Sequence, residues 1–242
     1  MSVLVQVFLV FIAIATSVLS GTIGMGGGIV LLSIMTLFMP LVHIIPVHGV
    51  VQLVSNTSRF YLLREHIKRP AVFYFALGLP FGGLPAFFVL KEVESKTPFF
   101  ALIILLILYA LFKPKKLPAL KIPMWGFLGV GAAVGFLSPL VGATGPFIAP
   151  FFLRDDFTKE NIVATKATVQ SLGHLLKFPI FFGLGFDYLA FLPLILGMTV
   201  AAMVGTKLGI GVLKKINPRI FTLLFKAALG IAALRLIWKM IH

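Results

Sequence analysis

Long apolar stretches recur along this chain of 242 residues and limit the folds open to it. Examples are Val3–Leu19, Phe99–Phe112 and Ile220–Leu234, the last with a single Lys inside it. Hydrophobic residues make up 60% of the chain and charged residues only 12%, whereas soluble domains have about 45–50% apolar and about 25% charged residues. Such stretches are typical of transmembrane helices. The sequence therefore predicts an all-α, polytopic membrane protein.

Glycines, prolines and charged residues divide the chain into ten apolar segments, five in each half. The segments lie at about 3–20, 26–42, 45–63, 71–90 and 98–112, then at about 123–137, 143–153, 161–182, 187–212 and 220–238. The first segment lacks a basic n-region, so we interpret it as a helix of the mature protein and not as a signal peptide. The second segment of each half is too short, or too rich in Gly and Pro, for a span of about 20 residues. We expect a first repeat at 1–112, a basic linker at 113–122 and a second repeat at 123–242.

The two halves carry one residue pattern at a constant offset of 118 residues. In the first half, Gly24-Met-Gly-Gly-Gly28 precedes a set of polar residues formed by His48, Gln52, Asn56 and Arg59. In the second half, Gly142-Ala-Thr-Gly-Pro146 precedes Lys166, Gln170, His174 and Lys177. A duplicated pattern in an apolar chain predicts a transporter built from two structural repeats, with its binding site between them.

Loop charges predict how the repeats are oriented. Five short or broken helices per half is an odd number, so the second repeat would be inverted relative to the first. With the N-terminus outside, the cytoplasmic loops contain 12 basic residues: Arg64, Lys68, Arg69, Lys113, Lys115, Lys116, Lys121, Arg154, Lys159, Lys214, Lys215 and Arg219. Only Lys91, Lys96 and Lys239 fall outside, which the positive-inside rule favours. An alternative treats 26–42 and 143–153 as re-entrant hairpins and leaves eight full spans.

The predicted membrane segments contain basic and polar residues but no acid. All 7 acidic residues fall in loops or at their edges. His48, Gln52, Asn56 and Arg59 have helical spacing and share one face of the third segment, and Lys166, Gln170, His174 and Lys177 repeat this spacing. A buried cation usually faces a cavity and a partner, so an anionic substrate is expected to supply the missing charge. Snorkelling or helix-bridging is the alternative for Arg59, Lys166, Gln52 and Gln170, and is favoured for Lys207, Lys226 and Arg235.

The glycine-rich segments predict breaks in the second helices. Gly24–Gly28 is not a P-loop, because no Gly-Lys-Ser/Thr follows, and it is not a dinucleotide fingerprint. Close helix packing is one interpretation of these glycines. The other is a broken helix whose free N–H groups at Gly26, Gly27, Gly28 and Gly145 face the anion.

The chain resembles the TauE/SafE sulfite-exporter family of bacterial membrane carriers. The resemblance covers nearly the whole chain and depends on Gly24–Gly28, on His48-Gly-Val-Val-Gln52-Leu-Val-Ser-Asn56-Thr-Ser-Arg59, and on Thr165-Lys-Ala-Thr-Val-Gln170-Ser-Leu-Gly-His174-Leu-Leu-Lys177-Phe178. It implies export or uptake of sulfite, of sulfonates such as sulfoacetate, or of related small organic anions across the bacterial inner membrane.

The function expected from the sequence is that of a secondary carrier working by alternating access. Arg59, Lys177 and Lys166 would supply charge, and His48 and His174 are candidates for proton coupling. We call the two matching sets of polar residues, on segments 45–63 and 161–182, the polar stripes. The stripe of the second half has more basic residues, so we expect the anion to lie closer to that half. An anion channel and a carrier for a carboxylate remain alternatives.

Several other functional classes of protein are not expected from the sequence. The chain has no cysteine, which excludes thiolate metal sites and disulfides, and no metal or cofactor is predicted. Ser171 and His174 lack a buried carboxylate and no HExxH motif occurs, so an enzyme is not expected. The net charge of +14 is assigned to loops that contact anionic lipid, not to nucleic-acid binding. A homodimer is one option for assembly.

Overall fold

In a computed structural model, the described part of the chain is built from helices. The structure describes residues 2–92 and 121–241, together with residues 101, 104 and 108. Its α-helices are α1 (Val3–Ile23), α2 (Gly27–Met35), α3 (Leu41–Leu62), α4 (Arg69–Glu92), α6 (Phe127–Val141), α7 (Gly145–Phe152), α8 (Lys159–Gly183), α9 (Leu192–Lys215) and α10 (Pro218–Ile241). Short 3₁₀ turns lie at η1 (Arg64–His66), η2 (Met124–Gly126) and η3 (Leu189–Phe191). The expected segment 98–112 and linker 113–122 lie almost entirely outside the described residues.

Two helices end at matching glycines, as the 118-residue repeat predicts. Gly24 follows α1 with φ 79°, and Gly142 follows α6 with φ 82°. This left-handed region is open to glycine without the steric penalty that a Cβ brings. The N–H of each glycine donates to a serine carbonyl in the preceding turn, Ser20 at 2.8 Å and Ser138 at 3.1 Å. The chain then reverses into α2 or α7.

The helices after these turns are too short to cross a bilayer. The α2 helix has 9 residues and α7 has 8, so they measure about 12–14 Å at 1.5 Å per residue, against a hydrocarbon core of about 30 Å. By contrast, α1, α4, Met124–Val141 and Leu189–Lys215 are long and apolar enough to span. The segment expected at 26–42 is therefore one short helix at 27–35, because Pro40 begins the next helix at Leu41.

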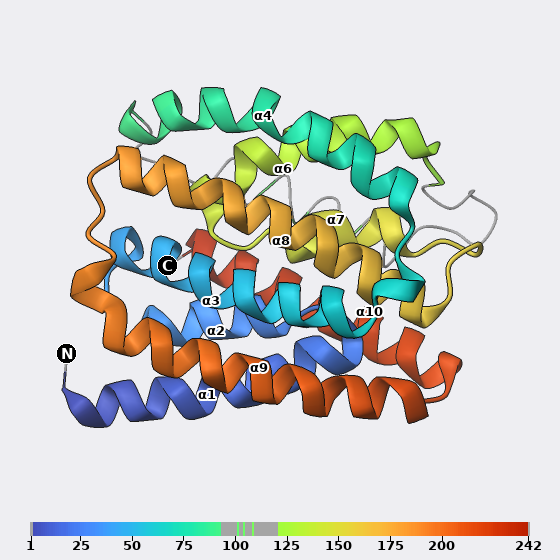
Figure 1. Cartoon of the computed structure of the whole chain (residues 1–242), viewed down its shortest axis with the longest axis horizontal. Helices are drawn as coiled ribbons and strands as arrows, with labels where there is room; N and C mark the ends of the chain where they lie inside the picture. The colour runs from blue at the N-terminus through green and yellow to red at the C-terminus, as the bar shows by residue number, and fades with distance from the viewer. Residues whose placement is uncertain (1, 93–100, 102–103, 105–107, 109–120, 242) are drawn as a thin grey trace.

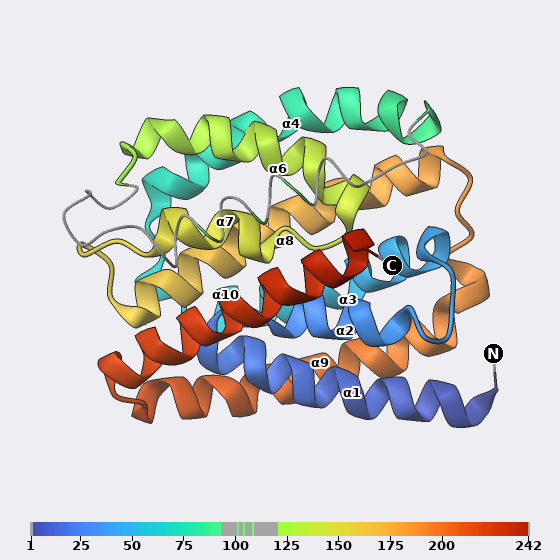
Figure 2. The ribbon, with the colours of Figure 1, turned by 180° about the vertical axis from the view of Figure 1, so that it is seen from behind.

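Helices pair between the two halves of the sequence. The α1 helix packs along α9, and α4 packs along α6, while α3 and α8 lie side by side between these pairs (Figure 1). Seen from behind, α10 crosses in front of α1 and α2, and α7 lies over α8 (Figure 2). The third helices, which carry the polar stripes, are thus at the centre of the molecule.

Glycines allow both outer pairs to approach closely. A Cβ added at Gly82 of α4 would lie 1.8 Å from the Ala132 carbonyl oxygen of α6. A Cβ at Gly205 of α9 would lie 2.3 Å from the Ile14 carbonyl oxygen of α1. Ile14 and Ala132 are 118 residues apart and so occupy matching positions, whereas Gly82 and Gly205 are 123 residues apart. Small residues of this kind let membrane helices pack backbone to backbone.

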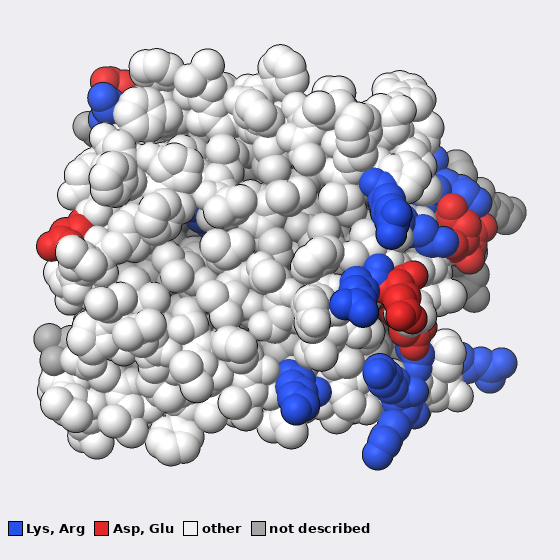
Figure 3. Space-filling view, viewed as in Figure 1, with Lys and Arg blue, Asp and Glu red and all other residues white. Residues whose placement is uncertain are grey.

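Charged residues gather at the ends of the molecule, and the sides are apolar. One end holds most of the Lys and Arg atoms drawn in Figure 3. The loops α3–α4, α7–α8 and α9–α10 meet there, and they contribute Arg64, Lys68, Arg69, Arg154, Lys159, Lys214, Lys215 and Arg219. The Arg154 guanidinium bonds to the Asp156 carboxylate at 2.8 Å and lowers the pKa of that carboxyl. Exposed apolar side chains such as Phe81, Leu84 and Val200 cover the sides, as expected for contact with lipid.

Candidate functional site

The two polar stripes face one another inside the molecule. Seven of their eight residues are buried, and only Gln170 is partly exposed. His48, Arg59, Lys166 and Lys177 each expose 1% or less of their surface. Burying so many polar groups is unfavourable unless each finds a partner, so their contacts indicate what the site needs.

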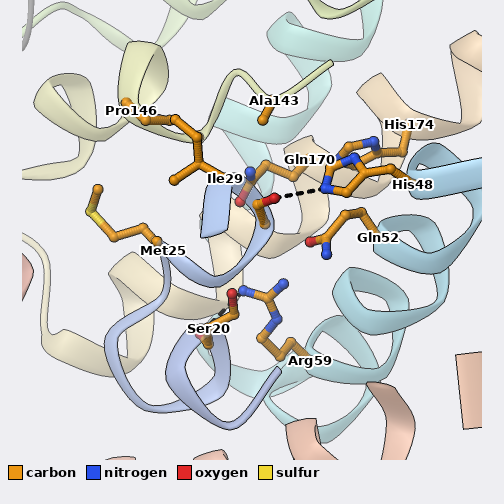
Figure 4. A pocket seen from close by; sticks show the side chains of 13 residues that line it. Ser20, Met25, Ile29, His48, Gln52, Arg59, Ala143, Pro146, Gln170 and His174 are labelled. Atoms are coloured by element: carbon orange, nitrogen blue, oxygen red, sulfur yellow. Dashed lines mark hydrogen bonds between the residues drawn. The ribbon is translucent and has the colours of Figure 1, made fainter. Parts of the chain in front are cut away.

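A small cavity lies where the two third helices meet the two glycine turns. Its lining comes from both halves of the sequence: Ser20, Met25, Gly26, Gly28, Ile29, His48, Gln52, Arg59, Ala143, Gly145, Pro146, Gln170 and His174 (Figure 4). The cavity volume is about 20 Å³. A single water needs about 10–15 Å³ in this measure, so this conformation has no room for a sulfonate.

Arg59 connects α3 to the end of α1. Its guanidinium donates from Nη1 to the Ser20 carbonyl at 3.2 Å, from Nη2 to Asn56 Oδ1 at 2.6 Å, and from Nε to the Ser55 carbonyl at 3.4 Å. A guanidinium has five N–H donors, so two have no partner among the described residues. Because Arg59 also lines the cavity, these donors are available to an anion there.

The two lysines bind carbonyl oxygens at the helix breaks. Lys166 Nζ of α8 donates to the Gly24 carbonyl at 2.8 Å, across the two halves. Lys177 Nζ, also on α8, donates to the Gly142 carbonyl at 2.5 Å. Helix C-termini carry partial negative charge, which cations offset. Both lysines therefore stabilise the chain reversals from behind the cavity and are not among its lining residues.

The two histidines lie opposite each other at one side of the cavity. Their ring centroids are 6.0 Å apart. His48 Nε2 is 2.8 Å from the Gly28 carbonyl oxygen, which can only accept a hydrogen bond. The Nδ1 atoms of His48 and His174 are both buried without a hydrogen-bond partner among the described residues.

The N-termini of α2 and α7 reach the cavity without a side-chain cap. Gly26 precedes α2 and Thr144 precedes α7, and neither provides a side-chain hydrogen bond to the helix. Gly28 and Gly145 line the cavity beside Gln52 and Gln170: an added Cβ would lie 3.0 Å from Gln52 Oε1 and 3.2 Å from Gln170 Nε2. Uncapped helix N-termini carry free N–H groups and partial positive charge, which suit an anion.

A larger hollow lies further along α3 and α8, at the end of the molecule that holds the N-terminus. Its volume is about 610 Å³, and it is lined mainly by apolar residues with His43 and Asp187 among them. Ile45 and Phe181 also line it, and they lie within about one turn of His48 and Lys177 on the same helices. We call this hollow the vestibule.

A family model described as "Sulfite exporter TauE/SafE" matches residues 9–236. The match includes both glycine turns, both stripes and the cavity. The chain belongs to the sulfite exporter TauE/SafE family. Searches among curated proteins and solved structures found no significant match. Membership in the TauE/SafE family implies a multi-pass membrane transporter of sulfur-containing anions, which agrees with the apolar helices.

The predicted site residues of this TauE/SafE protein divide into two layers. His48, Gln52, Arg59, Gln170, His174, Gly26, Gly28 and Gly145 line the cavity. Asn56, Lys166, Lys177 and Gly27 lie behind it. Asn56 donates to the Gln52 carbonyl at 2.8 Å, and Gly27 packs against the Thr16 carbonyl of α1. The expectation that the anion lies nearer the second half stays a prediction, since Arg59 of the first half is the only Lys or Arg among the lining residues that the structure describes.

Sequence reasoning missed five lining residues. Ser20, Met25, Ile29, Ala143 and Pro146 are neither charged nor part of the helical stripes. The repeat contains a signal for two of them, since Met25 and Ala143 are 118 residues apart inside the matching glycine segments. The same offset relates Ser20 to Ser138, whose carbonyls accept from the turn glycines.

Metal-ligating groups and the hydroxyl of Ser171 are the other features to consider among the described residues. No group of three His, Cys, Asp or Glu residues in the described ranges could hold a metal ion. Ser171 Oγ donates to the Ala167 carbonyl and accepts from Thr57, so it is not paired with His174.

Proposed function

We propose that this protein is a secondary transporter that binds a small sulfur-containing anion, such as sulfite or sulfoacetate, at the central cavity. The observation that carries the proposal is the convergence of two uncapped helix N-termini and the free N–H groups of Arg59 on one cavity. Helix N-termini and guanidinium groups are both suited to oxyanions. Gln52 and Gln170 add amide donors, and the described lining residues include no acid.

The proposal includes two inverted repeats that move against one another. It is supported by the cross-pairing of α1 with α9 and α4 with α6, and by close glycine contacts in both interfaces, which meet the matching residues Ile14 and Ala132. The cavity of about 20 Å³ would have to widen to admit a sulfonate, and the vestibule of about 610 Å³ offers an approach from the end that holds the N-terminus. Access that changes from one end to the other is the mechanism such repeats use.

The proposed orientation places the basic end in the cytoplasm of a bacterial cell, with the protein in the inner membrane. Basic loops favour the cytoplasmic side, and anionic lipid headgroups would contact them. The vestibule then opens to the outside. Lys166 and Lys177 act by holding the turns at Gly24 and Gly142, so that the N-termini of α2 and α7 keep their direction.

Binding of sulfoacetate by the purified protein tests this proposal. We expect sulfoacetate to raise the melting temperature, and Arg59→Ala to weaken binding by about 10–100-fold, because hydrogen bonds to charged groups contribute about 1.5–3 kcal/mol. Arg59→Lys keeps the charge but loses the planar fork, so it should recover only part of the affinity. Arg64→Ala is the matched control, since Arg64 is exposed and lies over the Tyr61 ring.

Counterflow in liposomes tests the transport mechanism. A carrier loaded with unlabelled anion should accumulate labelled anion against its gradient, whereas a channel should not. Unchanged binding and counterflow in Arg59→Ala would contradict the assignment of the site.

A further inference from the structure

The hydrogen bond of His48 fixes which of its ring nitrogens carries a proton. Gly28 offers a carbonyl oxygen at 2.8 Å, so His48 Nε2 must be the donor. In a neutral imidazole the other nitrogen, Nδ1, is then a bare acceptor. This acceptor is buried and has no donor among the described residues. His174 also has an unpartnered, buried Nδ1, and its ring lies 6.0 Å from that of His48.

The unpartnered acceptor at His48 Nδ1 is unexpected in a cavity built to bind an anion. The other polar groups of the lining and the two uncapped helix ends supply donors, which match the oxygens of an anion. A bare imidazole nitrogen presents a lone pair to those oxygens and would repel them. A buried polar atom of this kind needs an explanation, and a proton placed on it turns the repulsion into a donor bond.

The charged groups around the two rings explain why the proton would arrive with the anion. Arg59 on α3, together with Lys166 and Lys177 on α8, are the ionisable side chains of the stripes besides the histidines. The helices α1, α2, α6 and α7 have no ionisable side chain in their described ranges. The described residues that line the cavity include Arg59 and no acid, so an imidazolium there would face a like charge, and a bound anion would supply its counter-charge.

We propose that His48 and His174 together take up one proton when the anion binds, and that this proton is transported with it; this inference depends on the proposed function of the same cavity. The proton comes from bulk water and binds the bare ring nitrogen of one of the two imidazoles, which is Nδ1 in His48, with no other bond made or broken. Two imidazolium rings 6.0 Å apart would repel each other, so the first proton disfavours the second. By linkage, the anion favours protonation as much as protonation favours the anion.

Calorimetry of the full-length protein with sulfoacetate provides the test. This probe has no group that titrates between about pH 6 and pH 8, so any proton taken up must come from the buffer. Titrations in two buffers of different ionisation enthalpy should give an uptake of about one proton per anion. As the pH is raised, the Kd for sulfoacetate should increase by up to about tenfold per pH unit, over the range in which proton uptake is coupled to anion binding.

Glutamine variants connect this uptake to the two rings. His48→Gln keeps an N–H donor for the Gly28 carbonyl but cannot be protonated, and it is combined with His174→Gln. We expect the double variant to bind without proton uptake and with little pH dependence. His66→Gln is the matched control, because His66 lies in η1 and is exposed.

The outcomes separate the two proposals. Binding by the wild-type protein without proton uptake, or uptake that persists in the double variant, would overturn the coupling but leave the anion site in place. No binding of sulfoacetate or sulfite at any pH would overturn the anion site itself, and the coupling with it. The calorimetry of the wild-type protein can overturn the proton coupling even if the double variant does not fold.

Discussion

The buried cations of this protein serve two different purposes. Lys166 and Lys177 each satisfy a carbonyl oxygen at a helix break, which offsets the negative end of the helix dipole. Arg59 does the same at Ser20 but keeps two N–H donors for the cavity that it lines. A long side chain with several donors can hold the fold and face a ligand at once, whereas an ammonium bonded behind the turn contributes mainly its charge.

Gly28 and Gly145 lead to a prediction about single residues. An added Cβ at Gly28 or Gly145 would press on Gln52 or Gln170 at 3.0–3.2 Å, so the glutamine must shift by a few tenths of an ångström. We expect Gly28→Ala and Gly145→Ala to fold and to weaken sulfoacetate binding by about tenfold, which corresponds to about 1.4 kcal/mol. Titration calorimetry measures the effect. Gly129→Ala is the control, because no described residue beyond its own turn of the helix lies within 4 Å of its added Cβ. Equal affinities in all three variants would contradict the role of the glycine turns.

The length of each helix and the residues on its packing surface correspond to its position in the fold. The α2 and α7 helices are short because their N-termini start near the middle of the protein, at the turns that follow α1 and α6. The longer helices α4 and α9 pack against the helices α6 and α1 through glycines. In a bilayer there is little hydrophobic gain from helix association, so close packing of this kind carries much of the stability.

This packing makes Gly82 and Gly205 sensitive to added volume. Their Cβ atoms would meet backbone oxygens at 1.8 Å and 2.3 Å, so the helices must separate. Overpacking typically costs about 1–3 kcal/mol, and we expect Gly82→Ala and Gly205→Ala to lower the melting temperature in detergent. Gly211→Ala on α9 places its Cβ more than 4 Å from every other side chain or distant backbone atom in the described part of the chain, so it should leave the melting temperature unchanged. Similar melting of all three variants would show that these interfaces are looser than described.

At the scale of the whole molecule, the charged end and the apolar sides define how the protein sits in the membrane. The loops after α3, α7 and α9 meet at one end, and the N-terminus lies at the other (Figure 1). The loop after α3 and the loop after α8 follow corresponding helices but lie at opposite ends. Inverted repeats account for this arrangement, because corresponding helices then cross in opposite directions.

Cysteine labelling tests the inversion directly, since the chain has no cysteine of its own. Glu65→Cys follows α3 and Ala190→Cys follows α8, and both positions are exposed. In intact cells, we expect an impermeant thiol reagent to label Ala190→Cys and not Glu65→Cys, and the opposite in inside-out vesicles. Labelling of both positions from the same side would refute the inversion and the proposed orientation.

The sequence by itself determined the local features of this protein. Apolar stretches predicted membrane helices, and the structure confirmed the helical class. The 118-residue repeat located both glycine turns and both stripes, because φ preference and helical spacing are local properties. The same residues indicated the TauE/SafE family, which the match over residues 9–236 confirmed.

Only the tertiary structure decided which stripe residues line the cavity. Lys166 and Lys177 have the same spacing as their partners, yet they bind the carbonyls of Gly24 and Gly142 behind it. Likewise, the residue periodicity of α1 does not indicate that it pairs with α9. The hydrogen bond from the Thr22 hydroxyl to the Gly209 carbonyl joins residues 187 positions apart in the sequence. Spacing along a helix fixes which residues share a face. The direction in which that face points, and the helices that it contacts, depend on close packing between distant segments.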